Sequence, residues 1–521
     1  MLVTSNELIP ITDSERQLWQ EIVPEDHFLR RLSQAIDFEA YRPALESAYT
    51  GFGRPPFDSV FLLKLELLAR QYRLSDREVM AATRFSINYR LFLGISLKSP
   101  LPHPTVLTYF RNRQGPERMQ QVFDALVGQA RRLGLVKDRL RLKDATHILA
   151  NIAIPSTIRL VAETRDQLLE ALRPFAGPRV AEEEQRAEAI RVGTEDVQDE
   201  ERLLQRVTHL RAVLAWADEV PTQACFTQGN PRQQEKLRDA LTLAHKVLAD
   251  REDPKAGDKV RSVHDPDARC GKHGDYYNGY LMDVSMDADS EIVTALNVLP
   301  ANGDEGADAT QLLRQEEQAH GNDVQAMSID GAGYRGELLR ELTDPQGLNV
   351  EVFVPPPERI PLTVFGPEQF QLSPDGNTLT CPAGQTTQQR RPHDNTGTQF
   401  RFSPKQCRGC ALRSQCLANP ETKSRMVFKN DYEAEYRTAQ AKAQTPEYAQ
   451  IRKQHPAIER KLSEFVRRHD ARHARYRGQP KVLLQVLLTG MVVNLKRIVR
   501  LIFAPPEVAP EMVRAEGVGA S

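Results

Sequence analysis

The stretch VQAMSIDGAGY, residues 324–334, decides the fold. Its apolar residues predict a short buried strand that ends in Asp330, and a glycine-containing turn and an aromatic residue follow. Glycine allows the sharp turn and lets a bulky ligand approach the backbone. Because α/β sheets bind ligands beyond the carboxyl ends of their strands, we expect an α/β sheet with Asp330 at its reactive edge.

Upstream, the segment LRLKDATHILAN at residues 140–151 predicts a second strand, because its apolar residues alternate around Asp144. A third carboxylate, Glu459, lies far downstream in a basic helical region. We expect Asp144, Asp330 and Glu459 to meet in space and to hold two divalent metal ions for phosphodiester chemistry. Taken singly, each of these residues could equally be a helix cap or a turn residue.

Three carboxylates on rigid elements suit Mg²⁺ or Mn²⁺, since hard cations take oxygen ligands and keep several waters. Two such ions about 4 Å apart can activate the attacking hydroxyl, align the phosphate and relieve the charge that develops on it. Without metal the three negative charges repel one another, so the pKa of at least one carboxyl should be raised.

The composition is that of an ordinary globular protein, with 521 residues, 40% hydrophobic and 27% charged. This length allows two to four domains. The net charge of −1 results from segments of opposite charge. Residues 161–220 contain more Asp and Glu than Lys and Arg, whereas residues 452–500 carry a large excess of Lys and Arg. Such asymmetry is compatible with nucleic-acid binding.

The first residues, MLVTSNELIPITDSERQ, lack the basic and apolar regions of a signal peptide. No run reaches the ~18–20 uninterrupted apolar residues of a membrane-spanning helix. Six cysteines in this length are too few for a disulfide scaffold. We therefore expect a cytoplasmic protein without membrane contact.

Residues 1–135 are predicted to form short helices with tight polar turns. Ser75 and Glu78 have the spacing of a capping box at one helix start. The last short helix, TVLTYFRNRQ, carries Arg111 and Arg113, which we expect to be exposed near its end. The pattern fits a helix-turn-helix DNA-binding domain, and it fits a plain helical bundle with solvated arginines equally well.

The other boundaries follow from changes in composition and periodicity. The order of strands and helices is compatible with a ribonuclease-H-like core, a mixed α/β sheet with helices on its faces. The predicted parts are this core at 136–158 and 259–355, an insertion of two long antiparallel helices at 159–258, a cysteine-containing loop and strand insertion at 356–444, basic helices that complete the core at 445–503, and a flexible tail at 504–521.

Four cysteines lie in the 356–444 insertion, namely Cys381 in TCPAG and Cys407, Cys410 and Cys416 in CRGCALRSQC. The C-x-x-C pair is typical of half a tetrahedral site, and the other two thiolates would complete a structural Zn²⁺ site. The irregular spacing is compatible with free or packing thiols as well, so both interpretations stay open.

The basic region around Glu459 predicts contacts to phosphates. Arg452, His455 and Glu459 share a helical face, so Arg452 or His455 would reach the scissile phosphate or, alternatively, Arg452 would pair with Glu459 at the surface. The loop 467–481 with Tyr476 suits phosphate contacts and a stacked base, against the alternative of a solvated loop. The expected DNA contacts are arginines: Arg111, Arg113, Arg452, Arg467, Arg468, Arg472, Arg475 and Arg477.

Taken in order, the pieces resemble bacterial insertion-sequence transposases of the DDE type with an InsH-like N-terminal domain. The agreement runs from about residue 24 to 502 and includes GRPPFDSVFLLKL, HPTVLTYFRNR, KDATHILAN, SIDGAGYRGE, CRGCALRSQC and HPAIERKLSEFVRRHDARHARYRGQPKV. The resemblance implies a dimer that cuts the terminal inverted repeats of a DNA element and joins them to target DNA, on the nucleoid in the bacterial cytoplasm. It places the catalytic triad on Asp144, Asp330 and Glu459.

The chain departs from the Tyr-Arg-Glu-Lys signature that related transposases often carry. Tyr448 and Arg452 precede Glu459 by eleven and seven residues, farther than that pattern requires, and Val466 stands at the lysine position. Glu464 is therefore kept as the reserve candidate for the third carboxylate. Two other functions stay open, a catalytically inactive, domesticated DNA-binding protein and a ribonuclease-H-like nuclease that cuts without joining.

Overall fold

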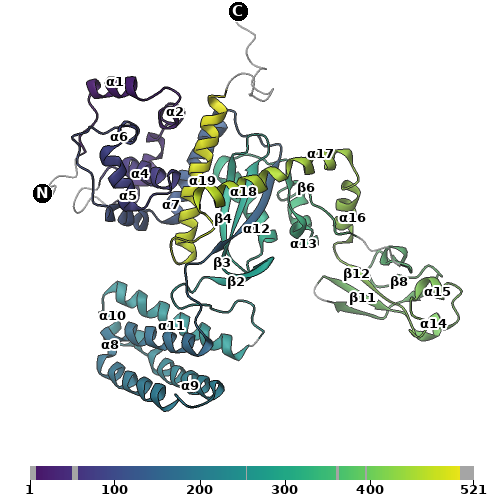
Figure 1. Ribbon diagram of the computed structural model, residues 1–521. Coiled ribbons are helices and arrows are strands. Elements are labelled where there is room, and N and C mark those ends of the chain that lie inside the picture. Colours follow the sequence, from purple (N-terminus) through teal and green to yellow (C-terminus); the bar gives the residue numbers. More distant parts are fainter. Residues whose placement is uncertain (1–7, 50–56, 254, 359–362, 394–395, 505–521) are drawn as a thin grey trace, which may run out of the picture.

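The computed structural model describes residues 8–49, 57–253, 255–358, 363–393 and 396–504. Figure 1 shows N-terminal helices, a central sheet, a helical insertion beneath the sheet and a small β-rich unit at the far side. The helix α19 (Gln479–Ile502) stands between the N-terminal helices and the sheet. Of the predicted flexible tail, only Ala504 belongs to the described residues.

The N-terminal part is helical, as predicted. Ser75 and Glu78 form the expected capping box at the start of α5, and α7 changes direction at Gly115, whose φ is 65°. The elements are α1 (Asp13–Ile22), α2 (Phe28–Ala35), η1 (Glu39–Tyr41), α3 (Arg42–Glu46), α4 (Ser59–Gln71), α5 (Asp76–Phe85), α6 (Ile87–Leu93) and α7 (Thr105–Arg132).

The central sheet is mixed, which confirms the predicted α/β class. Strand β1 pairs with β3 in antiparallel fashion on one side and with β5 in parallel fashion on the other, and β6 lies parallel beyond β5. Strands β2 and β4 both pair with β3. The six strands are β1 (Arg141–Leu149), β2 (Arg269–His273), β3 (Asp275–Asp287), β4 (Val293–Pro300), β5 (Ala326–Ser328) and β6 (Glu351–Phe353).

Four helices and one short turn position the edge of the sheet that carries Asp330. The turn η3 (Gly331–Gly333) follows Asp330 directly, and α12 (Glu305–His320) and α13 (Gly336–Thr343) flank β5 in the chain. Thr445 caps α17 (Pro446–Gln454), and α18 (Pro456–His469) begins at Pro456.

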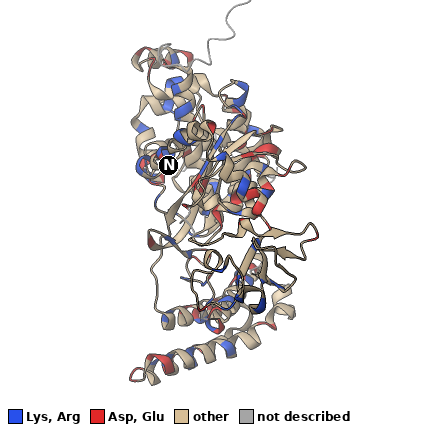
Figure 2. Ribbon diagram, turned by 90° about the vertical axis from the view of Figure 1, so that its right-hand side faces the viewer, with Lys and Arg blue, Asp and Glu red and all other residues tan. Residues whose placement is uncertain are grey.

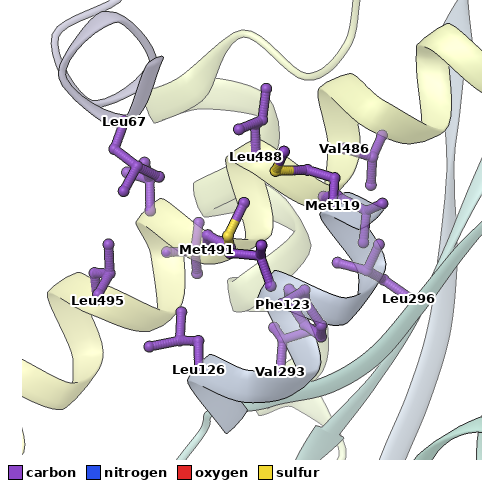
Figure 3. Close-up of a cluster of buried hydrophobic side chains, with 14 of the residues drawn as sticks. Leu67, Met119, Phe123, Leu126, Val293, Leu296, Val486, Leu488, Met491 and Leu495 are labelled. Atoms are coloured by element: carbon purple, nitrogen blue, oxygen red, sulfur yellow. The ribbon is translucent and has the colours of Figure 1, made fainter. Parts of the chain in front are cut away.

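Helix α19 joins the N-terminal helices and the sheet in one hydrophobic core. Figure 3 shows its side chains among those of α4, α7 and β4, namely Leu67, Met119, Phe123, Leu126, Val293, Leu296, Val486, Leu488, Met491 and Leu495. By length and composition α19 could cross a membrane, but 83% of its most apolar window is buried inside the protein. It is a packing helix, as its polar residues predicted.

The helical insertion has a core of its own and contains three long helices instead of two. Pro174 and Pro178 lie inside α8 (Thr157–Gly193), which bends at Ala176 and continues, because prolines disturb a helix without necessarily ending it. The other helices are α9 (Asp199–Ala217), α10 (Ala224–Thr227) and α11 (Pro231–Glu252), with η2 (Val220–Thr222) between α9 and α10.

The remaining segment, which we call the cysteine unit, comprises residues 363–430 without 394–395. It contains two three-stranded antiparallel sheets. Helix α16 (Glu433–Lys442) then leads back to the central sheet. The unit's elements are η4 (Pro367–Gln369), β7 (Gln371–Leu372), β8 (Leu379–Thr380), β9 (Thr386–Thr387), β10 (Arg390–His393), β11 (Gly397–Arg401), α14 (Pro404–Arg408), α15 (Arg413–Cys416) and β12 (Met426–Asn430).

Candidate active site

Asp144 and Asp330 come from neighbouring parallel strands. The register pairs Arg141 with Met327 and Leu142 with Ser328, so the same register continued by two residues would set Asp144 beside Asp330. Burial raises the pKa of Asp144 to about 6, and the charges of Asp330 and Glu305 add to the rise, while a hydrogen bond from the Ala145 amide and the charge of Lys143 oppose it. The two aspartates therefore interact.

The turn after β5 fixes Asp330. Its carboxylate accepts a hydrogen bond of 3.1 Å from the amide of Ala332. At Gly333, any added Cβ would come within 2.6 Å of the Ile329 side chain, so only glycine fits there without movement. Gly333 thus lets the Asp330 loop pack closely against Ile329, whereas a Cβ at Gly331 would meet no atom within 4 Å.

Helix α17 brings Arg452 to the same place. Its Nη1 donates hydrogen bonds to the Ser328 hydroxyl at 3.0 Å and to the Ile329 carbonyl at 2.8 Å. Burial lowers the pKa of Arg452, whereas the charges of Tyr448, Asp330, Glu459 and Asp144 act to raise it. The charges of all three predicted carboxylates thus act on Arg452.

Glu459 is exposed in the first turn of α18, a helix that lies against β1. The reserve candidate Glu464 is engaged elsewhere, because it accepts hydrogen bonds from Lys496 at 2.6 Å and Lys461 at 3.3 Å. His455 is buried and lies 3.1 Å from the Ser328 hydroxyl. Burial lowers the pKa of His455 to about 4, and Arg452 contributes, so this histidine is neutral at ordinary pH.

Lys143 occupies the face of β1 opposite to Asp144. It is buried, pairs with Asp283 at 3.0 Å and donates a hydrogen bond of 2.6 Å to the carbonyl of Glu305 at the start of α12. The sequence reasoning did not identify Glu305, although its charge contributes to the raised pKa of Asp144. The sequence feature that could have pointed to Glu305 is NGDEGAD, a carboxylate-rich helix start that follows a strand.

Other carboxylates of the second strand region are structural. Asp287 pairs with the buried Arg141 at 3.0 Å. Asp265 accepts hydrogen bonds from the Tyr280 hydroxyl and from the amide of Gly478, at the start of α19. Within the described ranges, no group of three or more His, Cys, Asp or Glu side chains is arranged to hold a metal ion. The three predicted carboxylates therefore do not form a ready-made metal-binding group.

The predicted exposure of Arg111 is wrong. Only 8% of its side chain is exposed, and it pairs with the buried Glu66 at 2.5 Å and with Asp76 at 2.6 Å. The Tyr476 ring, expected to stack on a base, lies instead under the guanidinium groups of Arg70 and Arg111. These contacts tie α4, α5 and α7 to the C-terminal loop.

The other predicted DNA-binding arginines differ in exposure. Arg472 and Arg475 are half-buried. The main-chain carbonyl of Arg472 accepts a hydrogen bond of 2.8 Å from the amide of Leu149, at the end of β1. The exposed members are Arg113, Arg467, Arg468 and Arg477. Figure 2 shows basic and acidic residues interspersed along the ribbon.

The four cysteines of the cysteine unit surround one small cavity of about 30 Å³. Cys381, Cys407, Cys410 and Cys416 are all half-buried, and none forms a disulfide. Burial raises the pKa of the Cys416 thiol; Arg425 opposes the rise, and the neighbouring thiols add to it. Cys225 is exposed on α10, and Cys270 lies on β2, both outside the unit.

Two family models match the chain. A transposase domain (DUF772) matches residues 17–113, which include α2 to α6, and a transposase DDE domain matches residues 380–499, which include the four cysteines, Arg452 and Glu459. No solved structure matches the chain significantly. The two matched segments lie in the order that the resemblance requires, and they share the core around α19. Together, the two matches indicate an insertion-sequence transposase of the DDE type.

Proposed function

We propose that this transposase cuts the ends of its insertion sequence and joins them to target DNA at a site formed by Asp144, Asp330 and Glu459. The observation that carries the proposal is that Asp144 lies on β1 and Asp330 lies two residues beyond the end of its parallel neighbour β5, where the charge of Asp330 adds to the burial that raises the pKa of Asp144. The influence of all three carboxylates on Arg452 supports the inclusion of Glu459.

The strand arrangement supports a ribonuclease-H-like core. Strand β1 lies centrally, with antiparallel β3 and β4 on one side and parallel β5 and β6 on the other. Asp144 sits on the central strand, and Asp330 follows the carboxyl end of its parallel neighbour, where sheets of this class bind ligands. Helix α18 lies against β1 and supplies the third carboxylate.

The donor set fits Mg²⁺ or Mn²⁺. Transposases of this type act on DNA and generally use divalent metal ions. Burial is the main cause of the raised pKa at Asp144, and the charges of Asp330 and Glu305 add to it; a bound cation would oppose the rise. When bound, two such ions would stabilise charge on the phosphate and lower the pKa of the attacking water or hydroxyl. Asp144, Asp330 and Glu459 would hold them.

Arg452 is the residue best placed to orient the scissile phosphate. Its hydrogen bonds to Ser328 and Ile329 both come from Nη1. The guanidinium therefore has further N–H groups that could donate to a phosphate oxygen. His455 supports this role indirectly, because it contacts the same Ser328 hydroxyl and is neutral.

The proposed DNA partners are the terminal inverted repeats and the target. Exposed Arg113, Arg467, Arg468 and Arg477 would contact phosphates, with Arg472 and Arg475 beside them. Following the resemblance, we propose two copies of the chain on paired ends, acting on the nucleoid in the bacterial cytoplasm.

The test is an assay with labelled DNA that carries the inverted repeats flanking the gene, in Mg²⁺ or Mn²⁺. Asp144→Asn and Asp330→Asn should each lower cleavage and strand transfer by roughly 10²-fold or more while end binding persists. Asp323→Asn, an exposed aspartate upstream of β5, is the matched control and should keep full activity. Undiminished cleavage by the Asp330 variant would refute the site. Cleavage without joining by the native protein would indicate a nuclease, and end binding without cleavage would indicate a DNA-binding protein.

A further inference from the structure

The cysteine unit has less hydrophobic core than a fold of its size requires. Among its described residues, the buried apolar side chains are Phe370, Leu379, Phe400, Phe402, Leu417 and Val427. Small units below roughly 70–80 residues rarely gain more than about 3–5 kcal/mol from a single core and usually add disulfides or a metal. Its cysteines form no disulfide. The unit therefore lacks an evident source of stability.

One tight turn and two short helices bring the four cysteines to one cavity. Cys381 begins the tight turn between β8 and β9, closed by hydrogen bonds from its amide to Gln385 at 2.8 Å and from Gly384 to its carbonyl at 2.9 Å. Gly384 adopts a φ of 76°, which suits glycine. Cys407 lies in α14, Cys410 follows that helix, and Cys416 ends α15.

Two arginine side chains fix the backbone that carries these thiols. Arg413 donates from Nη1 to the carbonyl of Cys407 at 3.1 Å, and Arg425 donates from Nη1 to the carbonyl of Cys416 at 3.0 Å. Phe370 and Phe402 line the same cavity as the sulfurs and shield it. The volume of about 30 Å³ is enough for one small ion.

We propose that Cys381, Cys407, Cys410 and Cys416 bind one structural Zn²⁺ that holds the cysteine unit together. Four thiolates are a donor set that Zn²⁺ takes in tetrahedral structural sites. Because the four cysteines line the cavity without forming a metal-binding group, binding would draw their sulfurs inward. Each coordinating thiol loses its proton on binding.

The zinc content of the purified full-length protein tests the site. We expect about one Zn²⁺ per chain by elemental analysis, and less than about a tenth of that in Cys407→Ser and in Cys410→Ser. Cys225→Ser, an exposed cysteine in the helical insertion, should keep the metal. Asp330→Asn should keep it too, which separates this site from the proposed catalytic one.

A second measurement needs no variant. Replacement of the metal by Co²⁺ in the native protein should give the visible absorption of tetrahedral cobalt together with a sulfur-to-metal charge-transfer band. Native protein from zinc-supplemented cells that contains no stoichiometric metal, or that shows two disulfides by mass spectrometry, would overturn the proposal. Zinc that remains in both the Cys407 and Cys410 variants would overturn it as well.

Discussion

Arg452 donates a hydrogen bond of 2.8 Å to the main-chain carbonyl of Ile329, the residue that precedes Asp330. The bond joins the basic C-terminal helices to the strand end that presents the second proposed catalytic carboxylate. A guanidinium in this position both holds the backbone of the Asp330 loop and sets a positive charge among Asp144, Asp330 and Glu459. Fold and proposed chemistry thus depend on the same side chain.

Arg452→Lys should lower strand transfer by about ten-fold, because lysine keeps the charge but lacks the planar group that bonds Ser328 and Ile329 together. Arg452→Ala should lower it further. It should also reduce the Mn²⁺ concentration needed for half-maximal cleavage, since the variant removes a positive charge that competes with the cation. Lys453→Ala, at the exposed neighbouring position, is the control. An unchanged metal titration in Arg452→Ala would show that the residue acts on the backbone alone.

The raised pKa of Asp144 predicts how stability depends on pH in the metal-free protein. Below its ordinary value of 3.8, Asp144 is neutral in the folded and unfolded chains and costs no folding energy. Above about pH 6, Asp144 is charged in both the folded and the unfolded chain. Burial of this charge in the folded state lowers the free energy of unfolding by up to about 3 kcal/mol. Its destabilising effect therefore grows as the pH rises through this window.

Asp144→Asn should accordingly stabilise the metal-free protein at about pH 8, and the gain should fall by roughly half at about pH 5. Urea denaturation with a chelator present measures both values. Asp323→Asn should show no such pH-dependent gain, because Asp323 is exposed. A gain independent of pH would mean that the charge of Asp144 is not the cause.

The sequence allowed the positions of Asp144 and Asp330 to be predicted because each lies within or just after a short apolar strand, a local pattern. Pairing of the two strands then followed from the α/β class. Glu305 was not predicted, because a carboxylate-rich helix start such as NGDEGAD is common in proteins, and only the fold lets the charge of Glu305 act on Asp144. The core shared through α19 is equally non-local, since its residues come from α4, α7, β4 and α19.

For Arg111, in contrast, the sequence led to a prediction that is wrong. Its place near the end of a short helix predicted exposure, but its partners Glu66 and Asp76 precede it by 45 and 35 residues, and helical periodicity contains no information about such pairs. The prediction of two long helices in the insertion was wrong for a related reason. Whether a proline ends or bends a helix depends on the packing of the flanking turns, which in α8 is supplied by α9 and α11.

Arg111→Ala should destabilise the protein by about 3–5 kcal/mol, because it leaves the carboxylate of Glu66, only 1% exposed, buried without its partner. Arg113→Ala removes an exposed arginine two residues away and should change stability by less than about 0.5 kcal/mol. Chemical denaturation measures both. Equal stabilities of the two variants would show that the buried pair contributes nothing to folding.

The exposed arginines predict a change in the salt dependence of DNA binding. Replacing Arg467 and Arg468 together by alanine should weaken binding to all DNA sequences alike and reduce the slope of log affinity against log salt by about 2, since each phosphate contact releases about one counterion. Arg159→Ala, at an exposed position in the helical insertion, is the control and should leave the slope unchanged. Loss of end specificity with an unchanged slope would contradict phosphate contacts for this pair.

Gly490 of α19 packs against both β4 and α7. A Cβ there would lie 2.6 Å from Cδ2 of Leu296 and 3.2 Å from the ring of Phe123. Gly490→Val should therefore destabilise the protein by about 1–3 kcal/mol, even though valine is the better helix former. Gly128→Ala in α7 is the matched control, because its Cβ would meet no atom closer than 3.5 Å, and it should stabilise by about 0.5–1 kcal/mol. Thermal denaturation distinguishes the two. If α19 joins both parts in one core, the Gly490 variant should still unfold in a single transition for those parts; separate transitions of the N-terminal helices and the sheet would contradict the shared core.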